Sequence, residues 1–204
     1  MKLYLHDHPA SVTADELARD LLTLPSWRRQ KALSFRFLID RVLCTKAYLL
    51  LRQGLRECYG IDGNPEFAYI GHDNPVLKDY PDIRFNISHC RRGLLVVLDD
   101  HPIGCDIEEI ETSLDMNLCH HCYNNREIAE IVASADPLVS FTTFWTRKEA
   151  VLKLTGEGID DTCLHCLTVI SWSVYASRRL STMTMLLFIL FVSIGCHNRL
   201  FQFA

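Results

Sequence analysis

The sequence has no internal repeat, no low-complexity stretch before its C-terminal region and no strong excess of charge of either sign. With a formal net charge of −4 it is not expected to bind nucleic acid, because a basic surface is the usual electrostatic footprint of that function. The first ten residues, MKLYLHDHPA, lack the apolar core of a signal peptide, and their alternation predicts a strand. We therefore expect a cytoplasmic globular protein without membrane attachment, whose 204 residues suffice for one sizeable domain or two halves that share a core.

Cysteine, in contrast, is abundant. Nine cysteines in a chain without an export signal predict reduced thiols, many of them packed as small hydrophobic side chains. Four of them form two C-x-x-C pairs, Cys119 with Cys122 and Cys163 with Cys166, and four thiolates suit tetrahedral zinc. A zinc-binding interaction module is therefore the alternative to an enzyme. The long interval between the two pairs weighs against it.

The N-terminal half carries a basic segment. Residues 25–57 have apolar side chains at helical spacing and predict one or two helices, with Ser26 as a candidate N-cap. Asp40 is the one acid between Trp27 and Arg56, against eight basic residues: Arg28, Arg29, Lys31, Arg36, Arg41, Lys46, Arg52 and Arg56. Basic helices bind nucleotide phosphates, acidic protein partners or nucleic acid. No nucleic-acid-binding motif accompanies this segment, so we favour the first two.

Three short strands are predicted in the middle of the chain. Residues 60–81 are rich in Gly, Asn, Asp and Pro and predict loops with a short strand at residues 67–70. Residues 84–89, 94–98 and 103–110 then alternate in the manner of strands separated by turns, and we expect them to form a meander.

The third of these strands carries two carboxylates on one face. Asp106 and Glu108 are two residues apart, so strand geometry separates them by about 6–7 Å. A hard cation between them would relieve their repulsion, whereas the ordinary alternative is a solvated strand edge.

A predicted helix over residues 141–154 adds a third acid. Trp145, Glu149 and Lys153 share one face at i, i+4 and i+8. Glu149 and Lys153 form either a surface ion pair or a further carboxylate for a metal site, with the lysine reaching a phosphate.

The end of the first meander strand combines groups that suit an anion. In the segment FNISH, Asn86 and Ser88 share one face, and His89 lies where the strand meets a turn with Arg91 and Arg92. A single histidine at such a place is more often an ordinary turn residue.

Three segments together resemble a known family. FNISH, IGCDIE and FWTRKEAVLK, in this order, resemble the signature of the 4'-phosphopantetheinyl transferases, more closely the larger single-chain type that activates peptide and polyketide synthases. The resemblance implies an α+β fold of two pseudo-symmetric halves, each a helix packed on a small, mainly antiparallel sheet, with the active site between them. We place the halves at residues 1–100 and 101–204, and expect a monomer.

The resemblance also implies a role for each matching residue. Asp106, Glu108 and Glu149 would hold Mg²⁺, or Mn²⁺ in its place, on the pyrophosphate of coenzyme A. Glu149, or a water that it orients, would take the proton of a serine on an apo acyl or peptidyl carrier protein. Lys153 would steady the pyrophosphate with Lys148 beside it, and adenosine 3',5'-bisphosphate would leave. The remaining coenzyme A contacts would be Arg28, Lys31, Arg41, Ser88 and His89, and the stretch 123–127 would help receive the carrier protein.

The C-terminal segment departs from the family. Residues 160–204 lack convincing sheet strands apart from residues 167–175, which predict one strand that would cover the inner face of the 141–154 helix. The apolar run at 183–196 is shorter than the ~20 residues that span a bilayer. A buried strand, a membrane-surface anchor and a shifted reading frame all remain open for this run. We expect a poorly ordered tail and low solubility, low activity or both.

Overall fold

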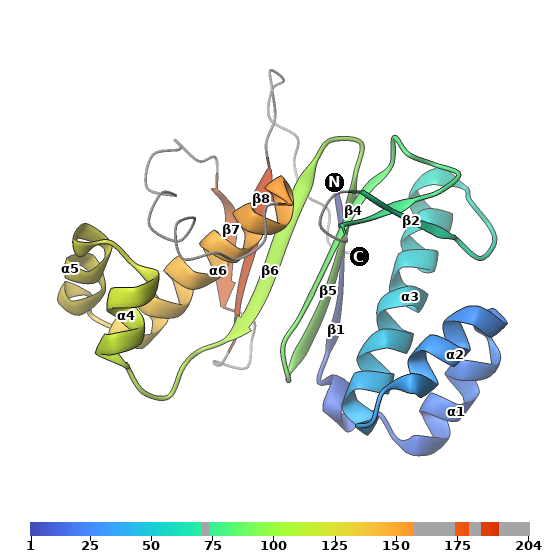
Figure 1. Ribbon diagram of the computed structural model, residues 1–204, viewed down its shortest axis with the longest axis horizontal. Helices are drawn as coiled ribbons and strands as arrows, with labels where there is room; N and C mark the ends of the chain where they lie inside the picture. Colours follow the sequence, from blue (N-terminus) through green and yellow to red (C-terminus); the bar gives the residue numbers. More distant parts are fainter. Residues whose placement is uncertain (71–73, 157–173, 180–184, 192–204) are drawn as a thin grey trace.

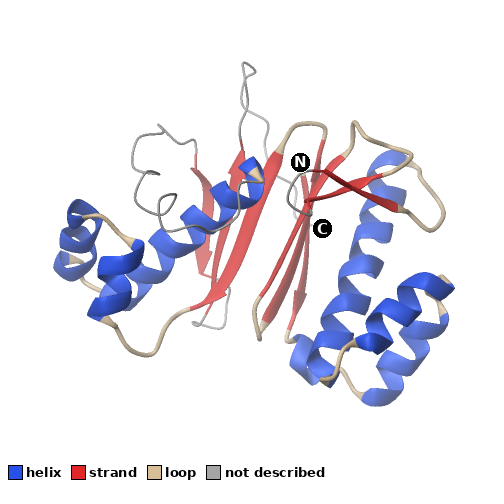
Figure 2. Ribbon diagram, in the orientation of Figure 1, coloured by secondary structure: helices blue, strands red, loops and turns tan. Residues whose placement is uncertain are grey.

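The computed structural model describes residues 1–70, 74–156, 174–179 and 185–191 (Figure 1). Two small sheets lie in the centre of the molecule, with helices on the outer sides of both (Figure 2). The N-terminal elements are, in chain order, β1 (Lys2–Asp7), η1 (Pro9–Ser11), α1 (Ala14–Leu22), α2 (Ser26–Ser34), α3 (Leu38–Tyr59), β2 (Phe67–Ile70), β3 (Asn74–Leu77), β4 (Arg84–His89) and β5 (Gly93–Asp99). The C-terminal elements are β6 (Ile103–Glu109), α4 (Met116–Cys122), α5 (Asn125–Ala133), α6 (Pro137–Thr155), β7 (Val174–Arg179) and β8 (Met185–Phe191).

The first sheet has the order β1-β5-β4 and is antiparallel throughout. Its central strand β5 is buried along its whole length, because both faces of the sheet are covered. Leu94, Val96 and Leu98 pack in clusters with α3, whereas Leu95 and Val97 pack against β6. A strand covered on both faces reads as a continuous apolar run, as the sequence LLVVL does here.

The second sheet has the order β6-β8-β7 and is also antiparallel. Helix α6 lies along β6 (Figure 1). The two approach so closely at Gly104 that a Cβ atom there would lie 2.8 Å from the backbone nitrogen of Leu154. Because Asp106 is two residues further along β6, its side chain points to the same side, toward α6.

The helix ends follow local signals in the sequence. Asn124 and Glu127 form a capping box at the start of α5, and Gly156 ends α6 with φ 73°. The basic segment forms two helices, α2 and α3, because the backbone is extended at Phe35 and Phe37 between them. Pro25 is the N-cap of α2, and Ser26 is its first helical residue.

The predicted α+β class is confirmed, but the predicted meander is wrong in one respect. β4 and β5 form the expected hairpin, whereas β6 pairs with β8. β1 already occupies the second edge of β5, so β6 has no edge to join there. η1, α1, β3 and α4 were not predicted.

The C-terminal segment contributes two strands to the described structure. β8 falls within the apolar run, so a strand is the alternative that matches, and residues 167–173 of the predicted covering strand lie outside the described residues. Within the part that the structure describes, no helix combines the length and the hydropathy needed to cross a membrane.

Candidate functional site

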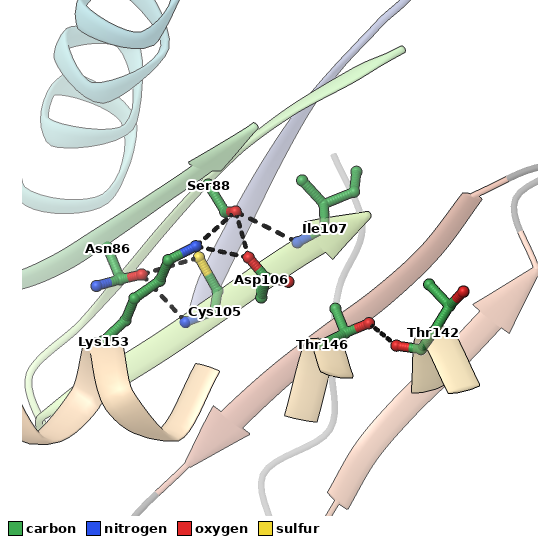
Figure 3. Close-up of polar contacts among 8 residues, drawn as sticks. All are labelled: Asn86, Ser88, Cys105, Asp106, Ile107, Thr142, Thr146 and Lys153. Carbon is green, nitrogen blue, oxygen red and sulfur yellow. Dashed lines mark hydrogen bonds and ion pairs between the residues drawn. The ribbon is translucent and has the colours of Figure 1, made fainter. Parts of the chain in front are cut away.

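Asp106 lies at the centre of the candidate site. Its side chain leaves β6 and bonds to residues of β4 and α6 (Figure 3). Its Oδ1 atom accepts a hydrogen bond from Ser88 Oγ at 2.7 Å and another from Lys153 Nζ at 2.5 Å. The side chain is 1% exposed, and Oδ2 has no hydrogen-bond partner among the described residues. A buried carboxylate oxygen without a partner is costly, so this atom fits a bound cation.

Glu108 and Glu149 add negative charge beside Asp106. Desolvation, and after it the charge of Asp106, raises the pKa of Glu108 to about 7. Desolvation also raises the pKa of Glu149, while Lys153 opposes this rise and Asp106 adds to it. The three carboxylates therefore repel one another, which a cation would relieve.

The protein supplies only part of a metal shell. Among the residues that the structure describes, no three or more His, Cys, Asp or Glu side chains form a group that could hold a metal ion, and this includes the three predicted carboxylates. Mg²⁺ is usually bound by one or two carboxylates, with water and substrate phosphate as the remaining ligands. The donors present fit that ion.

Lys153 and His89 border the carboxylates. Lys153 Nζ bonds to Ser88 Oγ at 2.9 Å as well as to Asp106, and the lysine side chain remains 30% exposed. Desolvation, and after it the positive charge of Lys153, lowers the pKa of His89 at the end of β4. Asp40 at the start of α3 acts on the same ring in the opposite direction, so the beginning of α3 also lies near the site.

The predicted basic residues gather around the α2–α3 junction. Lys31 Nζ lies 5.6 Å from the centroid of the Phe35 ring, and Arg41 Nε donates to the Phe35 carbonyl oxygen at 2.8 Å. Arg28 is half-buried, donates to the Cys44 carbonyl oxygen at 2.9 Å, and packs over aromatic rings, including that of Tyr48. The junction thus brings Lys31 and Arg41 together and fixes Arg28 among aromatic side chains.

Lys148 has buried protein partners. Its Nζ donates to Glu127 Oε2 at 2.8 Å and to the Cys122 carbonyl oxygen at 3.0 Å, 5.0 Å from the centroid of the Tyr123 ring. Lys153 lies five positions after Lys148, so the two lysines leave α6 on different sides. The contacts of Lys148 therefore do not match the expected role beside the pyrophosphate, and they join α6 to α4 and α5 instead.

Ser88 also has hydrogen-bond partners within the protein. Its side chain is buried, and its hydroxyl bonds to Asp106, to Lys153 and to the Ile107 N–H group. These contacts do not match the expected one with the adenosine 3'-phosphate. The sequence signal for these contacts within the protein is the alternation along β4, in which polar residues alternate with the apolar Phe85 and Ile87.

The zinc alternative finds no support. Cys119 and Cys122 are buried in an apolar cluster with neighbours such as Ile131 and Phe141. Cys163 and Cys166 lie outside the described residues.

Comparison with known proteins agrees with the resemblance in the sequence. The family model described as the 4'-phosphopantetheinyl transferase superfamily matches residues 102–184. The 4'-phosphopantetheinyl transferase psf-1 of Bacillus pumilus is 32% identical over 135 residues, which cover 65% of this chain and 58% of that protein. The 4'-phosphopantetheinyl transferase Sfp of Bacillus subtilis is 26% identical over 164 residues, covering 78% of this chain and 72% of Sfp.

A cyanobacterial protein is also similar. The 4'-phosphopantetheinyl transferase HetI of Nostoc is 31% identical over 164 residues, which cover 76% of this chain and 64% of HetI. The matched family region contains β6 and α6, the two elements that carry Asp106, Glu108, Glu149 and Lys153. Residues 102–184, which carry these side chains, therefore match the 4'-phosphopantetheinyl transferase superfamily.

Proposed function

We propose that this protein transfers the 4'-phosphopantetheine group of coenzyme A to a serine of an apo acyl or peptidyl carrier protein and releases adenosine 3',5'-bisphosphate. The observation that carries the proposal is the buried, unpartnered Oδ2 atom of Asp106 with Glu108 and Glu149 beside it. The family supports the reaction class.

Asp106, Glu108 and Glu149 would hold Mg²⁺, with Mn²⁺ as a substitute. When bound, the ion neutralises and orients the coenzyme A pyrophosphate. The partial protein shell leaves coordination positions for phosphate oxygens and water.

Glu149 is the candidate base. The serine hydroxyl oxygen forms a bond to the phosphorus on the pantetheine side of the pyrophosphate, and the bond from that phosphorus to the leaving adenosine 3',5'-bisphosphate breaks. The serine proton passes to the Glu149 carboxylate or to a water that this carboxylate holds. The raised pKa of Glu149 makes it a stronger base than an exposed glutamate.

Cationic side chains would bind the rest of coenzyme A. Lys153, within reach of both the carboxylates and solvent, would steady the pyrophosphate. Lys31, Arg41 and His89 would bind the adenosine 3'-phosphate region, with Arg28 packed among the aromatic side chains of the α2–α3 region.

The two halves of the chain would have different roles in the reaction. Residues 1–100 would supply the coenzyme A phosphate contacts, and residues 101–204 the metal-binding strand and helix. The stretch 123–127, fixed to α6 by Lys148, would help receive the carrier protein. We propose that the protein acts in the cytoplasm as a monomer.

Mass spectrometry tests the reaction. A panel of apo carrier proteins is incubated with the protein, coenzyme A and Mg²⁺, and at least one carrier should gain the mass of phosphopantetheine. Excess chelator should stop the reaction, and Asp106→Ala serves as the inactive control. Failure to modify any carrier would contradict the proposed reaction, whereas full modification in chelator would contradict only the metal role.

A further inference from the structure

Strands β4 and β6 lie side by side, but they belong to different sheets. Side chains of β4 bond to the backbone of β6 (Figure 3). They take the place of the backbone hydrogen bonds that would join the two strands if they belonged to one sheet. Asn86 Oδ1 accepts from the Cys105 N–H group at 3.1 Å, and Ser88 Oγ accepts from the Ile107 N–H group at 3.3 Å. Asn86 and Ser88 are two positions apart on β4, as their partners are on β6, so the two side chains hold the strands in a parallel register.

Ser88 makes two further contacts that Asn86 lacks. The Ser88 hydroxyl donates to Asp106 Oδ1 at 2.7 Å and accepts from Lys153 Nζ at 2.9 Å. A serine hydroxyl has one proton and two lone pairs, so these bonds and the one from Ile107 use its full capacity. The side chain is 3% exposed, which leaves little room for a ligand to reach it.

The arrangement fixes which oxygen of Asp106 is available. Ser88 and Lys153 both bind Oδ1, whereas Oδ2 is left without a partner among the described residues. Without the hydroxyl, Oδ1 would keep only Lys153, and Lys153 would lose its second acceptor. The ammonium group would then be free to lie between both carboxylate oxygens and compete with a cation for Oδ2.

We propose that Ser88 is a positioning residue that presents Oδ2 of Asp106 to the metal ion. The proposal rests on the proposed metal role of Asp106. Asn86 provides a matched control, because it makes the same kind of bond to the β6 backbone without touching a carboxylate.

Metal affinity is the readout. Mn²⁺ is titrated into the protein with coenzyme A in excess, and free Mn²⁺ is counted by electron paramagnetic resonance against a protein-free blank. Loss of a hydrogen-bond partner of a metal ligand typically weakens metal binding about 10–100-fold, and we expect this for Ser88→Ala. Asn86→Ala should bind Mn²⁺ as the unmodified protein does, and Ser88→Thr, which keeps the hydroxyl, should retain most of the affinity.

Thermal unfolding separates the positioning role from a structural one. Each alanine variant removes one acceptor from a β6 amide, and Ser88→Ala also removes a donor from the buried Asp106 carboxylate, so both should lower the melting temperature, Ser88→Ala by more. If Ser88→Ala does not fold, Ser88→Cys fills the same space with a much weaker donor and should show the same loss of Mn²⁺ affinity.

The outcomes distinguish this inference from the proposed function. Equal Mn²⁺ binding by the unmodified protein and by Asp106→Ala would overturn the metal role of Asp106 itself. If Asp106→Ala loses binding but Ser88→Ala or Ser88→Cys keeps it, or if Asn86→Ala loses as much as Ser88→Ala, the positioning role of Ser88 is wrong and the proposed function stands.

Discussion

Lys153 Nζ lies 2.5 Å from Asp106 Oδ1, and this ion pair joins α6 to β6 with its acidic partner buried and its basic partner 30% exposed. The two charges have different surroundings, so their removal should have different effects. The aspartate depends on its neighbours for stabilisation, whereas the lysine retains access to water.

Replacing Lys153 with alanine should destabilise the metal-free protein. The change leaves the buried Asp106 carboxylate with Ser88 as its remaining donor, a loss of about 1–3 kcal/mol. Solvent access to the lysine keeps the effect below that of breaking a fully buried pair. Urea unfolding measures the loss, with Lys78→Ala as control, because Lys78 forms an exposed ion pair with Glu66 and should change stability by less than about 1 kcal/mol. Equal effects at both positions would show that the Lys153 pair is no stronger than a surface one.

Asp106→Ala and Glu149→Gln should affect the reaction differently. Asp106→Ala removes a proposed metal ligand, so Mg²⁺ dependence and activity should fall together. Glu149→Gln keeps the shape and an oxygen donor but loses the base, and turnover should fall by the ~10²-fold typical of general-base loss while coenzyme A still binds. Steady-state kinetics and direct coenzyme A binding measure these effects. Near-normal turnover of Glu149→Gln would leave Glu149 as a surface partner of Lys153.

Alanine at Arg41 or His89 should act on coenzyme A. A charge-assisted phosphate contact is worth about 1.5–3 kcal/mol, so the KM for coenzyme A should rise more than the KM for the carrier protein. Lys46→Ala is the control, because this α3 lysine is paired with Asp20 instead. A larger rise in the carrier KM would place Arg41 and His89 on a carrier-binding surface.

Lys148→Ala should act on stability. It leaves Glu127 charged and buried, and breaking a buried pair by removing one partner costs about 3–5 kcal/mol. The double change Lys148→Met with Glu127→Leu removes both charges and should restore much of the loss. Chemical unfolding measures both variants. A Lys148→Ala protein of normal stability but with a raised coenzyme A KM would support the pyrophosphate contact that the sequence resemblance implied.

Local signals in the sequence predicted the parts of the site that lie within one element. Strand alternation placed Asp106 and Glu108 on one side of β6, and helical spacing placed Glu149 and Lys153 together on α6. The capping box at Asn124 and the glycine at position 156 are local signals of the same kind, because each depends on residues close in the chain.

Partners from other elements were not predictable in this way. Alternation identifies the faces of β6, but it does not say whether its edge pairs with β5 or with β8. The β8 run was left open because a continuous apolar run has no alternation that would distinguish a strand from a short anchor. The family motif gave the residue types at positions 88 and 148, whereas their partners, Asp106 and Glu127, depend on packing between distant segments.

Gly104 sets the spacing of the site without touching any of its reacting groups. With no clearance between β6 and α6 at this point, a single added methyl group would push the helix outward. Because Asp106 is on one element and Glu149 and Lys153 are on the other, that shift would lengthen every distance between them at once. The close approach of β6 and α6 that lets Lys153 bond to Asp106 therefore depends on a residue that has no side chain.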